Sequence, residues 1–383
     1  MSTERFNLAV PALAGVLLIL ATFWVPVSWL DTSPYPAASL LQNWQPRALL
    51  GTIADLFNLD ASGYTILKLG CLFIWLTIVI QQLDDSLGEQ PHRTLLLAGC
   101  GALFAFSTVT VITLGPAGFI DIAPYALSAG VVALLVRCDW QPDNKAVAAI
   151  TAALLLAVVG HEKALFEIAI LIVWSLWRTG WRNTAKLFAP AVILSLLYLM
   201  SVASTSTSGL SAEGYAGILS SGLGYLLARS LNVWGILAGG GALWVLYGLF
   251  AAKFIAGATD SGRRAAVTAT MLLLCLATLL IAGDTNRMVA LIWLPTLLLI
   301  TAVNPAAVFP STGWRAGLVV LCLLQLANPP VLMYRSGIVP FNCYSLAIAK
   351  RLPQGENVAQ GPFDIYAHNR PDLLRDLVER CNN

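Results

Sequence analysis

Two short polar segments interrupt long apolar runs of this chain, at residues 160–163 (Gly-His-Glu-Lys) and 283–287 (Gly-Asp-Thr-Asn-Arg). They contain groups suited to acid–base chemistry, because a carboxylate or an imidazole can accept a proton from a hydroxyl group. They also contain cations that can neutralise a phosphate, which Arg often binds through two parallel hydrogen bonds. Asp31 and Arg47 add an acid and a cation in the long loop after the first apolar run. Ionisable residues at membrane-helix ends are expensive to keep, so these positions are the first candidates for a functional site.

The composition is typical of a membrane protein. Of 383 residues, 58% are hydrophobic and 11% are charged, and the mean hydropathy is +0.76. Backbone polar groups in lipid must be satisfied within the chain, so long apolar runs predict helices. The first run is about as long as a membrane span and lacks a small-residue cleavage site, so we expect no cleavable signal peptide. We predict an all-α, polytopic transmembrane helical bundle over residues 1–333 and a small tail over 334–383, and a net charge of +2 gives no reason to expect a nucleic-acid partner.

About 20 mostly apolar residues are needed for a helix to cross a bilayer. The apolar runs predict eleven spans, at residues 7–30, 65–82, 95–114, 122–138, 144–160, 164–178, 186–203, 233–254, 264–283, 287–305 and 315–333. One side of this arrangement carries most of the loop cations: Arg5, Arg93, Arg137, Lys145, Arg178, Arg182, Lys186, Lys253, Arg263, Arg264 and Arg315. The other side, without the tail, carries Arg47, Lys68, Lys163, Arg229 and Arg287. Since cytoplasmic loops are enriched in Lys and Arg, the N-terminus is predicted inside and the C-terminus outside.

The stretch 144–178 has two interpretations: two short helices, or one long tilted helix with a buried polar kink. The basic loops on both of its flanks look cytoplasmic. Both flanks can lie inside only if the chain crosses twice between them, which favours two short helices. Residues 160–163 are then the tip of a hairpin on the outer face, and helices this short suggest a recess there.

Two outer loops and the tail are predicted outside the bilayer. In the first loop, 31–64, residues 46–57 have helical apolar spacing after a Pro, which predicts a helix on the membrane surface, with a loop helix packed on the bundle as the alternative. The second loop, 204–232, is rich in Ser and Gly and is either a lid near the site or a spacer. The tail contains an amphipathic stretch over 372–380.

The tail also contains two cysteines, Cys343 and Cys381, while the other five lie in spans or at their ends. An oxidising compartment favours a disulfide between these two. The bond would close a long loop and contribute roughly 3–4 kcal/mol to stability on the chain-entropy model.

The outer side gathers many ionisable groups near helix ends: Asp31, Arg47, Asp55, Asp60, Asp121, His161, Glu162, Lys163, Arg229, Asp284 and Arg287. Acids and cations beside a lipid-facing recess suit a substrate with a long lipid tail and a phosphate-linked head group. An anionic phosphate leaving group needs cationic stabilisation as its bond breaks. The set therefore predicts chemistry on a lipid-phosphate-linked sugar.

Each of these residues also has a simpler role that stays open. Asp284 and Arg287 are three residues apart at a helix boundary and can pair with each other. His161 can be a satisfied interfacial residue, and the Glu and Lys that follow it can form a solvated turn. Glu167, inside the next predicted helix, is expected to make a buried hydrogen bond rather than perform chemistry. No single residue indicates a site. What indicates one is that all of these residues are predicted on the same side of the membrane.

The layout resembles the GT-C class of integral-membrane glycosyltransferases, in which the first span leads into an outer loop with an essential acid, followed by helices on the membrane surface. Asp31 and residues 46–57 occupy these positions. The class often has paired acids in this loop, whereas Asp31 is followed by Thr32, so Asp55, Asp60 and Glu162 are alternatives for the base.

A second resemblance is to bacterial polytopic proteins of surface-polysaccharide loci, and O-antigen and exopolysaccharide polymerases share the general layout. It is carried by three short motifs: Arg47 with Gly51, then His161-Glu162, then Asp284-x-x-Arg287.

Together the resemblances imply a glycosyltransferase of the bacterial inner membrane. It would move a sugar from a polyprenyl-phosphate-linked donor to a glycan or lipid-linked acceptor on the extracytoplasmic face. The implied catalytic residues are Asp31, His161 and Glu162. The implied substrate and phosphate ligands are Arg47, Lys163, Arg229, Asp284 and Arg287.

Three alternatives and one cofactor question accompany this hypothesis. A polysaccharide polymerase is the close alternative, and a lipid-linked-glycan flippase or transporter is the alternative of another class. The third is a membrane acyltransferase that uses His161 as its base. A divalent metal stays open as a cofactor, although the sequence has no dedicated metal motif, because His92, His161 and His368 are far apart.

Overall fold

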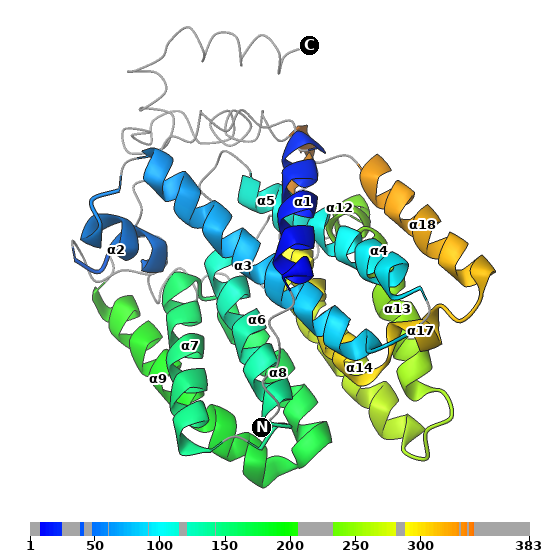
Figure 1. The fold of residues 1–383 in the computed structure, drawn as a ribbon. Helices are drawn as coiled ribbons and strands as arrows, with labels where there is room; N and C mark the ends of the chain where they lie inside the picture. Colours follow the sequence, from blue (N-terminus) through cyan, green and yellow to red (C-terminus); the bar gives the residue numbers. More distant parts are fainter. Residues whose placement is uncertain are drawn as a thin grey trace, which may run out of the picture.

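The computed structural model describes residues 8–24, 39–41, 48–59, 61–90, 92–114, 121–141, 143–205, 233–280, 288–328, 331–334 and 337–340. This part of the chain is almost entirely helical, and its helices pack side by side (Figure 1). The helices are α1 (Ala9–Trp24), α2 (Leu49–Leu56), α3 (Ala61–Leu87), α4 (Arg93–Ala105), α5 (Thr108–Leu114), α6 (Ile122–Arg137), α7 (Asn144–Gly160), α8 (Ala164–Thr179), α9 (Trp181–Thr205), α12 (Val233–Gly240), α13 (Ala242–Ile255), α14 (Ser261–Ala277), α16 (Trp293–Ala302), α17 (Pro305–Val308) and α18 (Thr312–Ala327), with the 3-10 segments η2 (Thr278–Leu280) and η3 (Ala290–Ile292). Each predicted span overlaps one helix or consecutive helical segments, and the predicted helical class is confirmed.

Two of the described helices are long and apolar enough to cross a membrane, over Gly63–Leu87 in α3 and Trp181–Val202 in α9. The pair α4 and α5 would make a third span if taken together, although the two helices are bent by 48° at their break. A helix of 16 residues, such as α6, is about 24 Å long, and bilayer hydrocarbon is roughly 30 Å thick. The total of eleven spans therefore stays a prediction.

The stretch 144–178 forms two helices, as predicted, and α7 and α8 run in opposite directions. Arg178, near the end of α8, forms an ion pair with Asp139 just after α6 (Nη2–Oδ1 2.7 Å). The indole N–H of Trp177 donates to Asp260, which precedes α14 (3.2 Å), and with Arg264 it holds the pKa of the Asp260 carboxyl below its ordinary value. The ends of α6 and α8 and the start of α14 thus meet at one end of the bundle, shown at the bottom of Figure 1.

We call this the basic end, because the helix termini that meet there carry most of the loop cations of the described chain: Arg137, Lys145, Arg178, Arg182, Lys186, Arg263 and Arg264. The hairpin tip at residues 160–163 lies at the opposite end of α7 and α8, which we call the site end. The predicted separation of the tip from the basic loops is confirmed for these helices.

The helix predicted over residues 46–57 is α2. Leu50 and Ala54 are buried on its bundle face, whereas Leu56 and Phe57 are 63% and 72% exposed. One face therefore packs on the bundle while the other offers apolar side chains to the surroundings. Residues 46–47 lie outside the described part, and the position of α2 relative to a membrane stays a prediction.

A chain of edge-to-face aromatic contacts runs through the core between α3, α6 and α16. The rings of Trp75 and Trp293 are 5.6 Å apart between centroids, and those of Trp293 and Tyr125 are 5.5 Å apart. All three side chains are buried. This packing fixes Tyr125, whose hydroxyl belongs to the polar cluster described below.

Two helix breaks are joined by a single side chain. One break separates α4 from α5 at Phe106, and the other separates α12 from α13 at Gly241, whose φ is +51°. Gln325 of α18 donates to the carbonyl oxygen of Phe106 (2.7 Å) and accepts from the backbone N–H of Ala242 (2.7 Å). Apolar surroundings cannot satisfy the backbone groups that a break frees, so the buried Gln325 stabilises both breaks.

A short antiparallel hairpin follows α18 and was not predicted. Its strands are β1 (Val331–Tyr334) and β2 (Gly337–Pro340), with Val331 opposite Pro340. The last predicted span, 315–333, therefore ends early, at Ala327. Pro329 and Pro330 explain the stop, because a Pro disfavours helical backbone before it and lacks the N–H that a helix needs.

Candidate functional site

The hairpin tip is held tightly against α6 and α2. Gly160 ends α7, His161 has extended backbone, and α8 begins at Ala164. A methyl group added at Gly160 would lie 3.2 Å from the ring of Pro124 and 3.4 Å from Leu49, so only glycine fits without a shift. The backbone N–H of Ala48, just before α2, donates to the carbonyl oxygen of Val159 (3.0 Å). This packing brings α2, from the first predicted outer loop, into contact with the hairpin tip. Both segments were predicted on the same side of the membrane.

His161 lies between two carboxylates. Its Nε2 is 3.8 Å from Oδ1 of Asp121, and its Nδ1 is 3.3 Å from Oε2 of Glu162. The same Nδ1 lies 3.1 Å from the backbone N of Lys163. A neutral imidazole with its proton on Nε2 accepts this N–H, whereas an imidazolium donates to Glu162 instead. Protonation of Nδ1 would set its N–H against the backbone N–H of Lys163, so the charged ring must turn from that N–H toward Glu162.

Lys163 is engaged inside the cluster. Its ammonium group donates a short hydrogen bond to the hydroxyl oxygen of Tyr125 and lies 3.6 Å from Oδ1 of Asp121. The side chains of Lys163 and Asp121 are each 1% exposed. Asp121 precedes α6 without capping it, so its carboxylate is directed to the cations rather than to the helix N–H groups. A buried charge is tolerated only when it is paired, which explains why these two occur together.

Two further ionisable residues reach the cluster from inside helices. Lys68 of α3 is buried and interacts electrostatically with Asp121. Glu167 of α8 is fully buried, interacts with Lys163 and Asp121, and lies near Ser128. Neither Glu167 oxygen nor the Ser128 hydroxyl reaches hydrogen-bonding geometry with a described residue. Glu167 still interacts with the Ser128 hydroxyl, so its expected buried hydrogen bond stays a prediction.

All of these groups lie near the site end. Lys68 is seven residues from the start of α3, about 10 Å along the axis, and Glu167 is three residues from the start of α8, about 4.5 Å. Asp121 and Tyr125 lie at the start of α6. The helices α3, α6 and α8 thus direct their N-termini, which carry partial positive charge, toward the same region as the two lysines. The arrangement favours an anion at this end of the bundle.

The structure covers only some of the predicted site residues. His161, Glu162 and Lys163 lie at the hairpin tip beside Asp121, which the sequence placed on the same side. Asp55 lies on α2. The others lie outside the described residues: Asp31, Arg47, Asp60, Arg229, Asp284, Arg287 and the proposed disulfide pair Cys343 and Cys381.

Tyr125 and Ser128 were not among the residues predicted to form the site. Both lie on α6, four and seven residues after Asp121, so all three share one helix face. This spacing could have indicated that Tyr125 and Ser128 lie near the site, but only once Asp121 is known to face the hairpin tip.

Among the described residues, no group of three or more His, Cys, Asp or Glu side chains is arranged to hold a metal ion. Comparisons of the chain with known protein families, curated proteins and solved structures find no match. The polar cluster itself is therefore the basis for the function proposed below.

Proposed function

We propose that this chain is a membrane glycosyltransferase. It would move a sugar from a polyprenyl-phosphate-linked donor to a glycan or lipid-linked acceptor, on the extracytoplasmic face of a bacterial inner membrane. The observation that carries the proposal is the buried set Asp121, His161, Glu162 and Lys163, where acid–base groups and a cation meet at one end of an apolar helical bundle.

Glu162 is the proposed general base. Its side chain is 12% exposed, against 1% for Asp121 and 3% for His161, so it is the carboxylate of the cluster that a substrate can reach most directly. It would accept the proton of the acceptor hydroxyl while that oxygen attacks the anomeric carbon. The bond from this carbon to the phosphate oxygen breaks, and its electron pair leaves with the lipid phosphate. His161 orients Glu162 and can take over the proton, since both of its nitrogens face a carboxylate.

The leaving phosphate requires positive charge. The ammonium group of Lys163 already contacts Asp121 and Tyr125. Its proposed contribution is therefore to neutralise the negative charge of Asp121, which would otherwise repel the leaving phosphate. The N-termini of α6 and α8 add partial positive charge. Arg47 and Arg287 are the proposed direct phosphate ligands, because a guanidinium can bind a phosphate through two hydrogen bonds. Asp31 remains the alternative base, and Arg229 and Asp284 the further substrate ligands.

The orientation in the membrane belongs to the same proposal. With the basic end in the cytoplasm, as the excess of Lys and Arg favours, the cluster faces the outside. With eleven spans, this orientation would also place the C-terminus outside. The donor lipid would reach the cluster from the bilayer past α2, whose Leu56 and Phe57 are exposed apolar side chains close to the tip.

A transporter or flippase is the second candidate, favoured by the two broken helix pairs α4–α5 and α12–α13 and by the ionisable residues inside α3 and α8. Transporter sites are expected near the bilayer midplane. Lys68 and Glu167 instead lie within about 10 Å of the helix ends, which favours a site at one face. A polysaccharide polymerase uses similar chemistry and is distinguished from a glycosyltransferase by its glycan product.

The test compares Glu162→Gln and Arg287→Ala with the exposed control Glu89→Gln, which lies after α3. Each variant replaces the native protein in a deletion strain, and surface glycans are analysed by mass spectrometry. We expect membrane insertion in all three and loss of the glycan modification only in the first two. Full activity of both site variants would overturn the assignment. Glycans limited to a single repeat unit in the deletion strain would indicate a polymerase, and a missing side sugar a transferase.

A further inference from the structure

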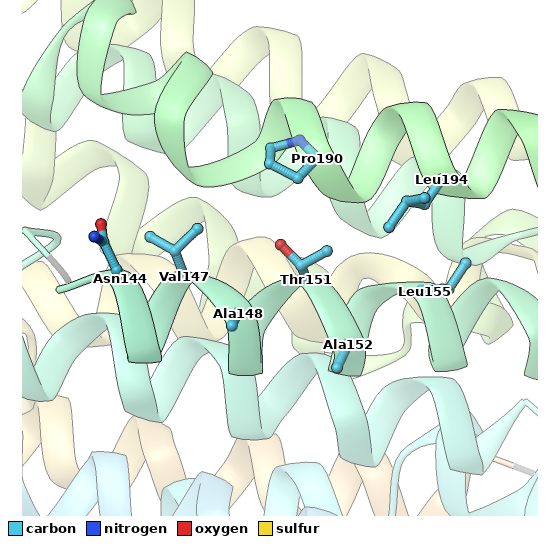
Figure 2. Close-up of a pocket in the computed structure, with 8 residues that line it drawn as sticks. All are labelled: Asn144, Val147, Ala148, Thr151, Ala152, Leu155, Pro190 and Leu194. Carbon is cyan, nitrogen blue, oxygen red and sulfur yellow. The ribbon is translucent and has the colours of Figure 1, made fainter.

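An apolar groove of about 510 Å³ lies between α7 and α9, on the outer surface of the bundle. Its walls are Val147, Thr151 and Leu155 of α7, which point toward Pro190 and Leu194 of α9 (Figure 2). Asn144, Ala148 and Ala152 complete the lining. The small alanines leave the space open, and the hydroxyl oxygen of Thr151 has no hydrogen-bond partner among the described residues.

The groove faces the region that lipid tails occupy. It borders α9, one of the two described helices that can cross a membrane by themselves. The neighbouring face of α9 exposes large apolar side chains: Ile193, Leu194, Leu196, Leu197 and Met200. From Asn144 to Leu155 the groove follows α7 for eleven residues, about 16 Å. One leaflet of bilayer hydrocarbon is about 15 Å thick, half of the total. The groove therefore has the length of one acyl chain in one leaflet.

Asn144 lines the basic end of the groove, and two lysines lie beside that end. Lys186 lies four residues before Pro190 on α9, and Lys145 lies three residues before Ala148 on α7, so each shares a helix face with a lining residue. Both lysines are exposed. Asp143 is also there, but its carboxylate accepts from the backbone N–H of Ala146 as the cap of α7.

Two features of α9 place this end of the groove at the level of a lipid head group. Trp181 at its start is 69% exposed, with the guanidinium of Arg182 5.5 Å from the ring centroid. Exposed Trp and Arg at a helix end are typical of the membrane–water interface. Pro190 also has no N–H to donate to the carbonyl oxygen of Lys186, which leaves an acceptor for a lipid glycerol or head-group hydroxyl.

We propose that this groove binds an anionic phospholipid, with one acyl chain along α7 and α9 and the phosphate between Lys145 and Lys186. The site lies at the opposite end of the bundle from the polar cluster and does not depend on the proposed glycosyl transfer. The recognised chemistry is an apolar chain joined to a head group of net negative charge.

The test measures lipid binding to the purified full-length protein in detergent by native mass spectrometry. Phosphatidylglycerol and phosphatidylcholine with identical acyl chains are compared. We expect the anionic lipid to bind roughly 25-fold more tightly, since each of the two lysines contributes on the order of a fivefold gain and the two gains multiply. The double variant Lys145→Gln/Lys186→Gln should reduce binding of phosphatidylglycerol to the level of phosphatidylcholine.

Two further variants separate the proposed site from general attraction to lipid. Ala148→Phe fills the groove from an exposed position and should weaken binding of both lipids. The control Lys253→Gln/Arg315→Gln also removes two positive charges, but from α13 and α18, and should leave binding unchanged. Equal binding of the two lipids by the native protein would overturn the proposal. So would an equal effect of the control pair, or full binding by Ala148→Phe.

Discussion

Breaking the buried ion pair between Lys163 and Asp121 should destabilise the protein far more than breaking the exposed pair between Arg178 and Asp139. The distances alone suggest the reverse, because the exposed pair is closer, at 2.7 Å against 3.6 Å. The side chains of the first pair are each 1% exposed, however, whereas those of the second are 33% and 78% exposed. Comparing the two pairs therefore tests whether burial or distance determines the strength of an ion pair in this bundle.

The structure allows the two magnitudes to be estimated. At 3.6 Å and an effective dielectric constant of 20, two unit charges interact by roughly 4–5 kcal/mol. Removing one partner of such a pair leaves an uncompensated buried charge and costs roughly 3–5 kcal/mol. His161, 3.8 Å from Asp121, keeps some compensation in Lys163→Met, so we expect the lower end of this range. For the exposed pair, water and side-chain ordering reduce the interaction to about 1 kcal/mol or less.

The assay is a double-mutant cycle for each pair, read as the free energy of unfolding in mixed detergent micelles. One cycle uses Lys163→Met and Asp121→Asn, and the other uses Arg178→Met and Asp139→Asn. In the buried cycle, the double variant should lose little more stability than either single variant, with a coupling energy of roughly 2–4 kcal/mol. A coupling in the exposed cycle that equals or exceeds the buried one would refute the reasoning, and with it the burial of the Lys163 and Asp121 side chains.

The remaining predictions concern the helix packing that supports the site. Gln325→Met removes the two hydrogen bonds that join the helix breaks and leaves two backbone groups unsatisfied, so it should lower the free energy of unfolding by about 2 kcal/mol or more in the same detergent assay. An unchanged stability would mean that other groups satisfy these breaks. Gly99→Ala would place a methyl carbon 2.7 Å from a Cδ of Leu318 and should cost about 1–3 kcal/mol. The control Gly70→Ala has open space around the added methyl and should be neutral or slightly stabilising, so equal losses in both variants would contradict the described contact between α4 and α18.

The helix assignment could be predicted well because it depends on local properties. Long apolar runs can form only helices in lipid, and Lys and Arg mark the ends of those runs. The loops on both sides of the stretch 144–178 were enough to predict the hairpin that α7 and α8 form. The hairpin β1–β2 was missed because a short apolar run after two prolines looks like the end of a span.

The residues that meet at the site could be predicted only in part. The sequence predicted that His161, Glu162 and Lys163 lie at the opposite end of the bundle from the basic loops, because successive spans run in alternating directions. Glu167 was predicted to be an ordinary buried residue, and no partner was predicted for Asp121. The order of the spans does not show which helix faces α6 or how α6 is rotated about its axis.

The sequence by itself determined the class of the protein, the helices and the end of the bundle at which the ionisable residues gather, because hydrophobicity and charge act on each segment separately. Only the tertiary structure decided which of these residues touch. Packing of α6 against the hairpin tip placed Asp121 between His161 and Lys163, and the aromatic contacts of Tyr125 fixed its hydroxyl beside the ammonium group. Helix rotation depends on side chains far apart in the chain, and the cost of burying a charge without a partner then selects the one arrangement in which these groups pair.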